Sequence, residues 1–168
     1  MRDGQRPPAD GTGHEAAVQA PARPTGGAVP VIRTIAMPAD TNPAGDIFGG
    51  WLMAQMDLAA GNVAARRARG RCATVAVESM AFYSPVFVGD EVSLFASITG
   101  TGRSSIRITV ETWRRDRTGE ETNKVTQAAF TFVAIDEARR PRALPSLDGA
   151  VTDGTHRETA AEPATATG

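Results

Sequence analysis

The sequence predicts an α+β domain in which an antiparallel β-sheet wraps around one long central helix. Three observations predict it. Residues 49–69 carry apolar and small side chains at helical spacing. The segments that follow are rich in β-branched residues or alternate between apolar and polar ones. Glycine and proline turn signals separate those segments. With one short strand before the helix, the order is β-α-β-β-β-β.

Composition limits the organisation of the chain. Its 168 residues, 41% of them hydrophobic, suit one domain with a sizeable core. Residues 1–30 are rich in proline and glycine and residues 146–168 are nearly free of large apolar side chains, so both are predicted to be disordered. The folded domain is therefore expected at 31–145.

Charge and cysteine content bear on partners and compartment. A formal net charge of −1 gives no support for binding nucleic acid or an anionic membrane. Cys72 is the only cysteine, which favours a reducing compartment. No apolar run is long enough to span a bilayer, and no secretory signal is evident at the start. These features predict a cytoplasmic protein.

The first two elements are a strand and the long helix. Residues 31–37 are expected to form a strand that Pro38 stops. Arginines fill the last turn of the helix, where cations suit the dipole, and Gly70 follows as a stop signal. Because the helix is small or apolar nearly all round, we expect it to be largely buried.

Four strands are predicted after the helix, over 74–83, 91–99, 105–115 and 124–135. Within the second of them Val92, Leu94, Ala96 and Ile98 should share one face. A hairpin turn is expected at 100–102, where two glycines flank a threonine.

The segment 42–57 contains the residues that can carry chemistry. Asp46 precedes Gly49 and Gly50 at the predicted start of the helix. An acid beside exposed backbone N–H groups supplies a base or nucleophile together with donors for an oxyanion, the two needs of acyl transfer. The alternative is an ordinary capped helix whose glycines allow close packing against the sheet.

Other chemistries are not supported by residue type. The only histidines, His14 and His156, lie in the predicted tails, so the folded domain has no Ser-His-Asp triad. We find no zinc-ligand cluster, phosphate-binding loop or dinucleotide fingerprint, and so expect no metal and no cofactor.

The pattern Asn-x-x-Gly-Asp-x-Phe-Gly-Gly over 42–50 resembles that of the YciA-like acyl-CoA thioester hydrolases of the hotdog-fold superfamily. The likeness continues through 74–82, 88–90, 102–107 and 141–145, and covers the folded domain but neither tail. Ala138-Arg139 departs from the family, which more often has a glycine turn there. The resemblance implies a hotdog fold, hydrolysis of acyl-CoA, subunits joined edge to edge in dimers with sites at their interface, and hexamers built as trimers of dimers.

The resemblance also implies roles for particular residues. Asp46 corresponds to the catalytic carboxylate, which either activates water or attacks the thioester to form an anhydride; Gly49 and Gly50 would donate to the oxyanion. The substrate-binding candidates are Asn42, Phe48, Glu78, Arg103, Ser104 and Ser105.

Several of these residues have a structural alternative. Asn42 could instead stabilise its own loop through local hydrogen bonds. Glu78 could be a solvent-exposed strand residue, and Arg103 could be an exposed hairpin residue rather than a phosphate contact. Asp57, the second acid of the helix, is expected to make structural hydrogen bonds. Arg139, Arg140 and Arg142 suit a solvated tail or the nucleotide of coenzyme A. A non-catalytic acyl-CoA-binding or regulatory module on the same fold is the alternative function.

Overall fold

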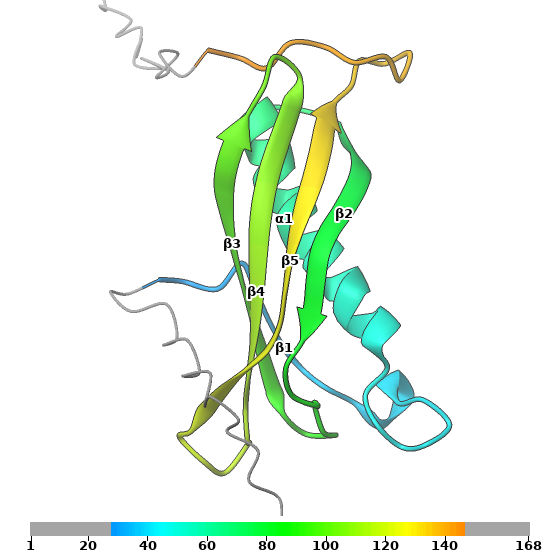
Figure 1. The fold of residues 1–168 in the computed structure, drawn as a ribbon, viewed down its shortest axis with the longest axis vertical. Helices are drawn as coiled ribbons and strands as arrows, with labels where there is room; N and C mark the ends of the chain where they lie inside the picture. The colour runs from blue at the N-terminus through cyan, green and yellow to red at the C-terminus, as the bar shows by residue number, and fades with distance from the viewer. Residues whose placement is uncertain (1–27, 147–168) are drawn as a thin grey trace, which may run out of the picture.

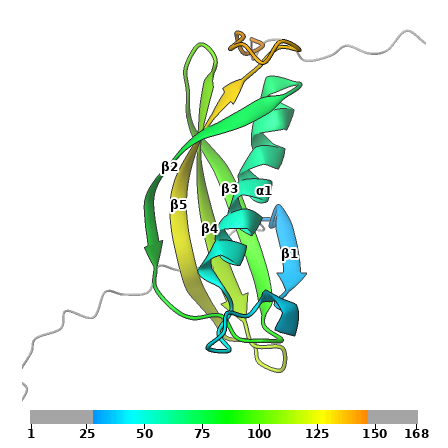
Figure 2. The ribbon, with the colours of Figure 1, turned by 90° about the vertical axis from the view of Figure 1, so that its right-hand side faces the viewer.

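The computed structural model describes residues 28–146, in which one long helix lies across one face of a five-stranded antiparallel sheet (Figures 1 and 2). The elements are β1 (Ile32–Ile35), the short 3₁₀ helix η1 (Pro38–Asp40), α1 (Gly49–Ala68), β2 (Cys72–Phe82), β3 (Glu91–Thr101), β4 (Ser105–Arg115) and β5 (Thr122–Ala134). The predicted fold class and element order are confirmed. The predicted disordered leader and tail lie almost entirely outside the described residues.

The strands are arranged in the order β1-β3-β4-β5-β2, so β1 and β2 form the two edges. The chain passes from β1 through α1 to the far edge before it returns through the middle of the sheet. This places β2, the strand after the helix, with one side paired to β5 and the other unpaired among the described residues.

The core lies between α1 and the concave face of the sheet. The side chains of Ile106, Ile108 and Val110 on β4 are fully buried, as their alternation predicts. Alanines and Met56 face them from the helix, and their small size lets the sheet approach closely. No helix among residues 28–146 has the length and apolar character needed to cross a membrane.

The prediction that the helix is largely buried is wrong for one of its faces. Leu58 is 60% exposed and Met53 is 42% exposed, on the side away from the sheet. Val75 and Val77 on β2 are also exposed. An apolar sequence indicates that a helix is buried but does not identify the surface that buries it. Within one chain the sheet covers only the side of α1 that faces it.

The predicted hairpin turn at 100–102 is shifted by two residues. Gly100 and Thr101 pair with Arg107 and Ile106, so β3 runs on to Thr101. The turn spans 102–104 and closes with a 2.9 Å hydrogen bond from Gly102 N to Ser105 O. The register shifts between Ile98 and Gly100, which identifies the first glycine as a strand irregularity rather than a turn residue. Beside it Ile98, predicted to share a face with Val92 and Leu94, is 40% exposed, whereas those two residues are fully buried.

Two other strand limits differ from the prediction. β1 is shorter than 31–37 because Met37 already caps η1, its N–H donating to Asp40 Oδ2 over 2.9 Å. β2 begins at Cys72, earlier than expected, and contains two register shifts. Ser79, at the second shift, has a φ of 53°, the left-handed conformation that bulges use.

Candidate active site

The loop before α1 is a closed turn built around Asn42. The Asn42 side-chain oxygen accepts hydrogen bonds from Ala44 N at 2.9 Å and Asp46 N at 3.2 Å. Its backbone N–H donates to Asp46 O over 2.7 Å, and Gly45 occupies a φ of 91°. Asn42 therefore holds the loop, as its local bonding capacity predicts.

Asp46 is exposed in this loop, and within residues 28–146 its carboxylate has no hydrogen-bond or ion-pair partner. The N-cap of α1 is Phe48, and no side chain of the described part of the chain caps the helix. The alternative interpretation of this segment as an ordinary capped helix is therefore wrong. The loop presents the acid to solvent, close in sequence to a helix N-terminus that it does not occupy.

The uncapped N-terminus leaves the backbone N–H groups of Gly49 and Gly50 without acceptors among the described residues. A Cβ on Gly50 would lie 2.3 Å from a ring carbon of Phe48, whereas one on Gly49 would meet only Phe82, at 3.6 Å. Neither glycine is required by close packing against sheet backbone. A Cβ on Gly50 would require the exposed Phe48 ring to shift, whereas a Cβ on Gly49 would make only ordinary van der Waals contact with Phe82.

Two grooves adjoin this N-terminus. The groove beside Gly49, of about 320 Å³, is lined by Ile47, Gly49, Leu52, Phe82, Tyr83, Ser84, Pro85 and Val86. The groove beside Gly50, of about 380 Å³, is lined by Ala39, Asp40, Thr41, Phe48, Gly50 and Trp51. Phe48, a predicted substrate contact, is 57% exposed in the second groove.

Asp57 occupies a different setting, two turns along α1. Its Oδ1 accepts a 2.7 Å hydrogen bond from the Thr74 hydroxyl on β2, and the residue is half-buried. This is the hydrogen-bonded acid that the sequence predicts. Its second carboxylate oxygen has no partner among the described residues.

The remaining predicted contacts do not gather around Asp46. Arg103, Ser104 and Ser105 are at the β3–β4 turn, at the opposite end of the molecule from the loop before α1 (Figure 1). Glu78 is an exposed residue of β2 that forms an ion pair with Arg107 over 2.5 Å. In one chain the structure therefore brings together Asn42, Asp46, Phe48, Gly49 and Gly50 only.

The C-terminal arginines have structural roles that the sequence did not predict. Arg142 donates from Nη2 to Ala68 O, at 2.8 Å, and so caps the C-terminus of α1. Arg140 pairs with Asp136 at 3.1 Å. Arg139 has a φ of 61°, which explains why a glycine suits this turn.

Residues around the turn from β2 to β3 were also missed. Buried Asp90 accepts from Phe87 N at 3.0 Å and pairs with Arg114 at 3.1 Å. The bond fixes the segment that lines the groove beside Gly49. A lone Asp after a glycine turn gives no sequence signal of a buried ion pair.

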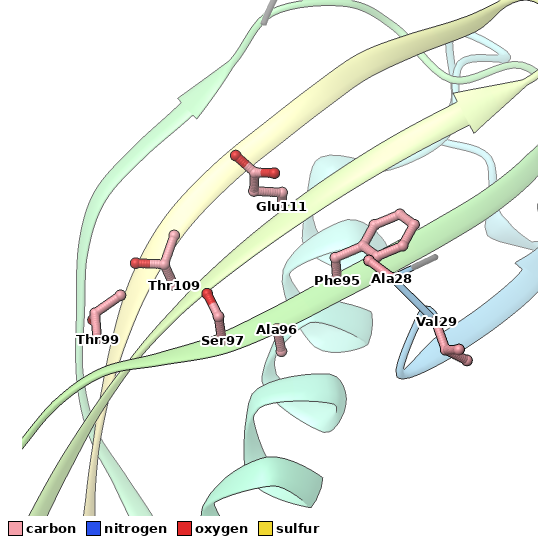
Figure 3. A pocket seen from close by; sticks show the side chains of 8 residues that line it. All are labelled: Ala28, Val29, Phe95, Ala96, Ser97, Thr99, Thr109 and Glu111. Carbon is pink, nitrogen blue, oxygen red and sulfur yellow. The ribbon is translucent and has the colours of Figure 1, made fainter. Parts of the chain in front are cut away.

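A separate hollow of about 470 Å³ lies against β3 and β4 (Figure 3). Thr109 and Glu111 line it and alternate with the core residues of β4, so it opens on the face of the sheet away from α1. It contains none of the predicted site residues.

Comparison with known proteins identifies the family. The model of the thioesterase superfamily matches residues 44–121. An uncharacterized acyl-CoA thioester hydrolase of Zymomonas mobilis is 56% identical over 119 residues, which are 71% of this chain and 80% of that protein. The acyl-CoA thioester hydrolase YciA of Escherichia coli is 48% identical over 118 residues, 68% of this chain and 89% of that protein. The chain belongs to the thioesterase superfamily.

Solved structures place this thioesterase-family chain among hotdog-fold enzymes. A hexameric broad-specificity acyl-coenzyme A thioesterase, solved as an aspartate-to-alanine mutant, matches with a TM-score of 0.69 and 47% identity, over 73% of this chain and 90% of that one. An acyl-CoA hydrolase of Staphylococcus aureus, solved as an aspartate mutant and as an asparagine mutant, is 28% identical with TM-scores of 0.63 and 0.64. These matches cover 68% of this chain and, respectively, 70% and 68% of those chains.

Proposed function

We propose that this chain hydrolyses acyl-CoA thioesters to a free carboxylic acid and coenzyme A. The observation that carries the proposal is the open N-terminus of α1, where the N–H groups of Gly49 and Gly50 have no acceptor within residues 28–146 and adjoin two grooves. Charge develops on the thioester oxygen when the carbonyl is attacked, and these donors with the helix dipole stabilise it. A C–O bond forms, the C–S bond breaks, and the departing thiolate takes up the proton that water gave to the base.

Two carboxylates compete for the role of base. Asp46 is the sequence prediction, and its proximity to Gly49 supports it. Asp57 is better supported by its surroundings, because the hydrogen bond from Thr74 orients one oxygen while the other has no partner among residues 28–146 and can act on substrate. A carboxylate that moves freely in solvent gains little of the positional advantage that catalysis needs.

A relative gives independent support for Asp57. The asparagine and the aspartate mutated in the Staphylococcus aureus hydrolase lie 15 positions apart. Asn42 and Asp57 have the same separation in this chain, whereas Asn42 and Asp46 do not. We therefore propose Asp57 as the base or nucleophile, working beside the Asn42 loop of a facing subunit, with Asp46 as the alternative.

Assembly follows from the uncovered surfaces. β2 is an edge strand with Val75 and Val77 exposed, next to the uncovered Leu58 on α1. We propose that two subunits join through this edge, which satisfies its backbone groups, and that three such dimers form a hexamer. Antiparallel pairing would set the Asp46 end of one subunit beside the Arg103 end of the other, where Arg103, Ser104, Ser105 and Glu78 could contact coenzyme A. A single cysteine supports a cytoplasmic location.

Release of free thiol from acyl-CoA, followed with a thiol reagent, tests the activity and the base together. We expect Asp57→Asn to lower kcat about 10²–10⁴-fold, the scale of a positioned base. Asparagine keeps the acceptor for Thr74, so the fold should survive. Asp46→Asn should lower kcat less than about tenfold. Glu120→Gln, at a residue whose side chain is 98% exposed, is the control.

The reverse pattern in folded variants would assign the base to Asp46. Full activity of both single variants would refute the carboxylate mechanism. Binding of acyl-CoA without release of thiol by the unmodified chain would favour the non-catalytic module.

A further inference from the structure

The groove beside Gly49 has an apolar floor. Ile47, Leu52 and Val86 line it with at most 7% of their surface exposed, and Phe82 stands half-exposed at its rim. The Ser84 hydroxyl donates to Lys124 O at 2.7 Å, so its hydrogen is already committed elsewhere. A groove of this lining favours a hydrocarbon chain over a polar group.

The position of the groove relative to the N–H groups points to its occupant. A thioester whose carbonyl oxygen accepts from Gly49 and Gly50 sends its two substituents in opposite directions. The substituent on the Gly49 side meets the apolar floor, and the substituent on the Gly50 side meets Asp40 and Thr41. The hydrocarbon suits the first groove and the amide-bearing arm of coenzyme A the second. Accordingly, resting on the proposed hydrolase function, we propose that the groove beside Gly49 holds the acyl chain and that Val86 limits its length.

The chain segment that carries Val86 is fixed in place. Four residues further on, Asp90 accepts a hydrogen bond from Phe87 N at 3.0 Å and pairs with Arg114 at 3.1 Å. Gly89 N donates to Ala36 O at 2.8 Å, which anchors the same segment to the chain after β1. Because these bonds hold the segment from two sides, its backbone cannot shift outward to accommodate a larger side chain. A larger side chain at position 86 therefore reduces the space for substrate.

The test is the ratio of kcat/KM for palmitoyl-CoA to kcat/KM for acetyl-CoA, measured on the full chain. Val86→Ile adds one methylene to the groove, and one methylene in an apolar pocket changes kcat/KM about 10–200-fold. We expect Val86→Ile to lower the ratio about tenfold and Val86→Ala to raise it severalfold. Val88→Ile is the matched control, because Val88 is in the same segment, 47% exposed and outside the groove.

An unchanged ratio in both Val86 variants, with the variants folded and turning over acetyl-CoA, would overturn the inference. An equal change in Val88→Ile would also overturn it, since the effect would then come from the segment as a whole. Should Val86→Ile fail to fold, Val86→Ala alone decides, since it removes atoms and causes no clash. Failure of the unmodified chain to hydrolyse either substrate would instead refute the proposed function.

Discussion

The ion pair between Asp90 and Arg114 gives the sharpest prediction about stability. Asp90 is only 3% exposed, and its Oδ2 receives both Arg114 Nη1 and the Phe87 N–H. The Arg114 guanidinium also lies over the Phe87 ring, 5.1 Å from its centre. Arg114→Leu would keep apolar contact with the ring but leave the buried carboxylate with one hydrogen bond.

The expected loss in the free energy of unfolding follows from the charge that stays buried on Asp90. Breaking a buried ion pair by removing one partner costs about 3–5 kcal/mol, because the other charge stays buried without compensation. The Arg114 side chain is 19% exposed, so water partly reaches the pair and we expect the lower end, about 3 kcal/mol. Adding Asp90→Asn removes the stranded charge, and the double variant should recover part of the loss.

Urea unfolding at one fixed protomer concentration measures these differences, since oligomer stability depends on concentration. Arg115→Leu is the control, because Arg115 pairs with half-buried Glu91 at 3.2 Å and with exposed Glu120. Its loss of stability should be much smaller than that of Arg114→Leu. A loss below about 1 kcal/mol for Arg114→Leu, the scale of a surface pair, would refute the reasoning. So would a double variant less stable than Arg114→Leu alone.

Two further predictions concern assembly and the cysteine. Light scattering should find dimers or larger species, and more specifically hexamers, whereas a fully active monomer at micromolar concentration would contradict the proposed edge pairing. Burial raises the pKa of the Cys72 thiol, an effect that nearby Arg142 partly offsets. Since the thiolate is the reactive form, alkylation near neutral pH should be slower in the native protein than in urea, and equal rates would contradict the burial. The same shift predicts that the Cys72 contribution to stability is present below the ordinary thiol pKa and lost as pH rises through the raised value.

Much of the fold could be predicted because its signals are local. The start of α1 at Gly49 agrees with the prediction, and β4 agrees at both ends, since strict alternation fixes both register and face. The turn at 100–102 failed because glycine serves equally in a turn and in a strand irregularity. Which residue takes the turn depends on pairing with β4, which no local pattern encodes.

The candidate site could be predicted less completely, for a different reason. The Asn42 loop and the two glycines are adjacent in sequence, so their spacing carried the prediction. The hydrogen bond from Thr74 to Asp57 joins residues 17 apart on two different elements, and the pair Asp90–Arg114 joins residues 24 apart. Such contacts depend on strand order, and nothing in the sequence of β2 indicates that it pairs with β5.

The choice between the two acids also decides how many subunits a site needs. Gly49 and Asp57 are eight residues apart on one helix, a rise of about 12 Å. Reacting groups must come within about 3–3.5 Å of the same carbonyl. An Asp57 base therefore cannot serve the N–H groups of its own helix and must work with those of a facing subunit, whereas Asp46 could serve its own. The exposed edge of β2, to which Asp57 is bonded through Thr74, is the surface that a facing subunit would cover. Catalysis by Asp57 would thus require assembly through β2.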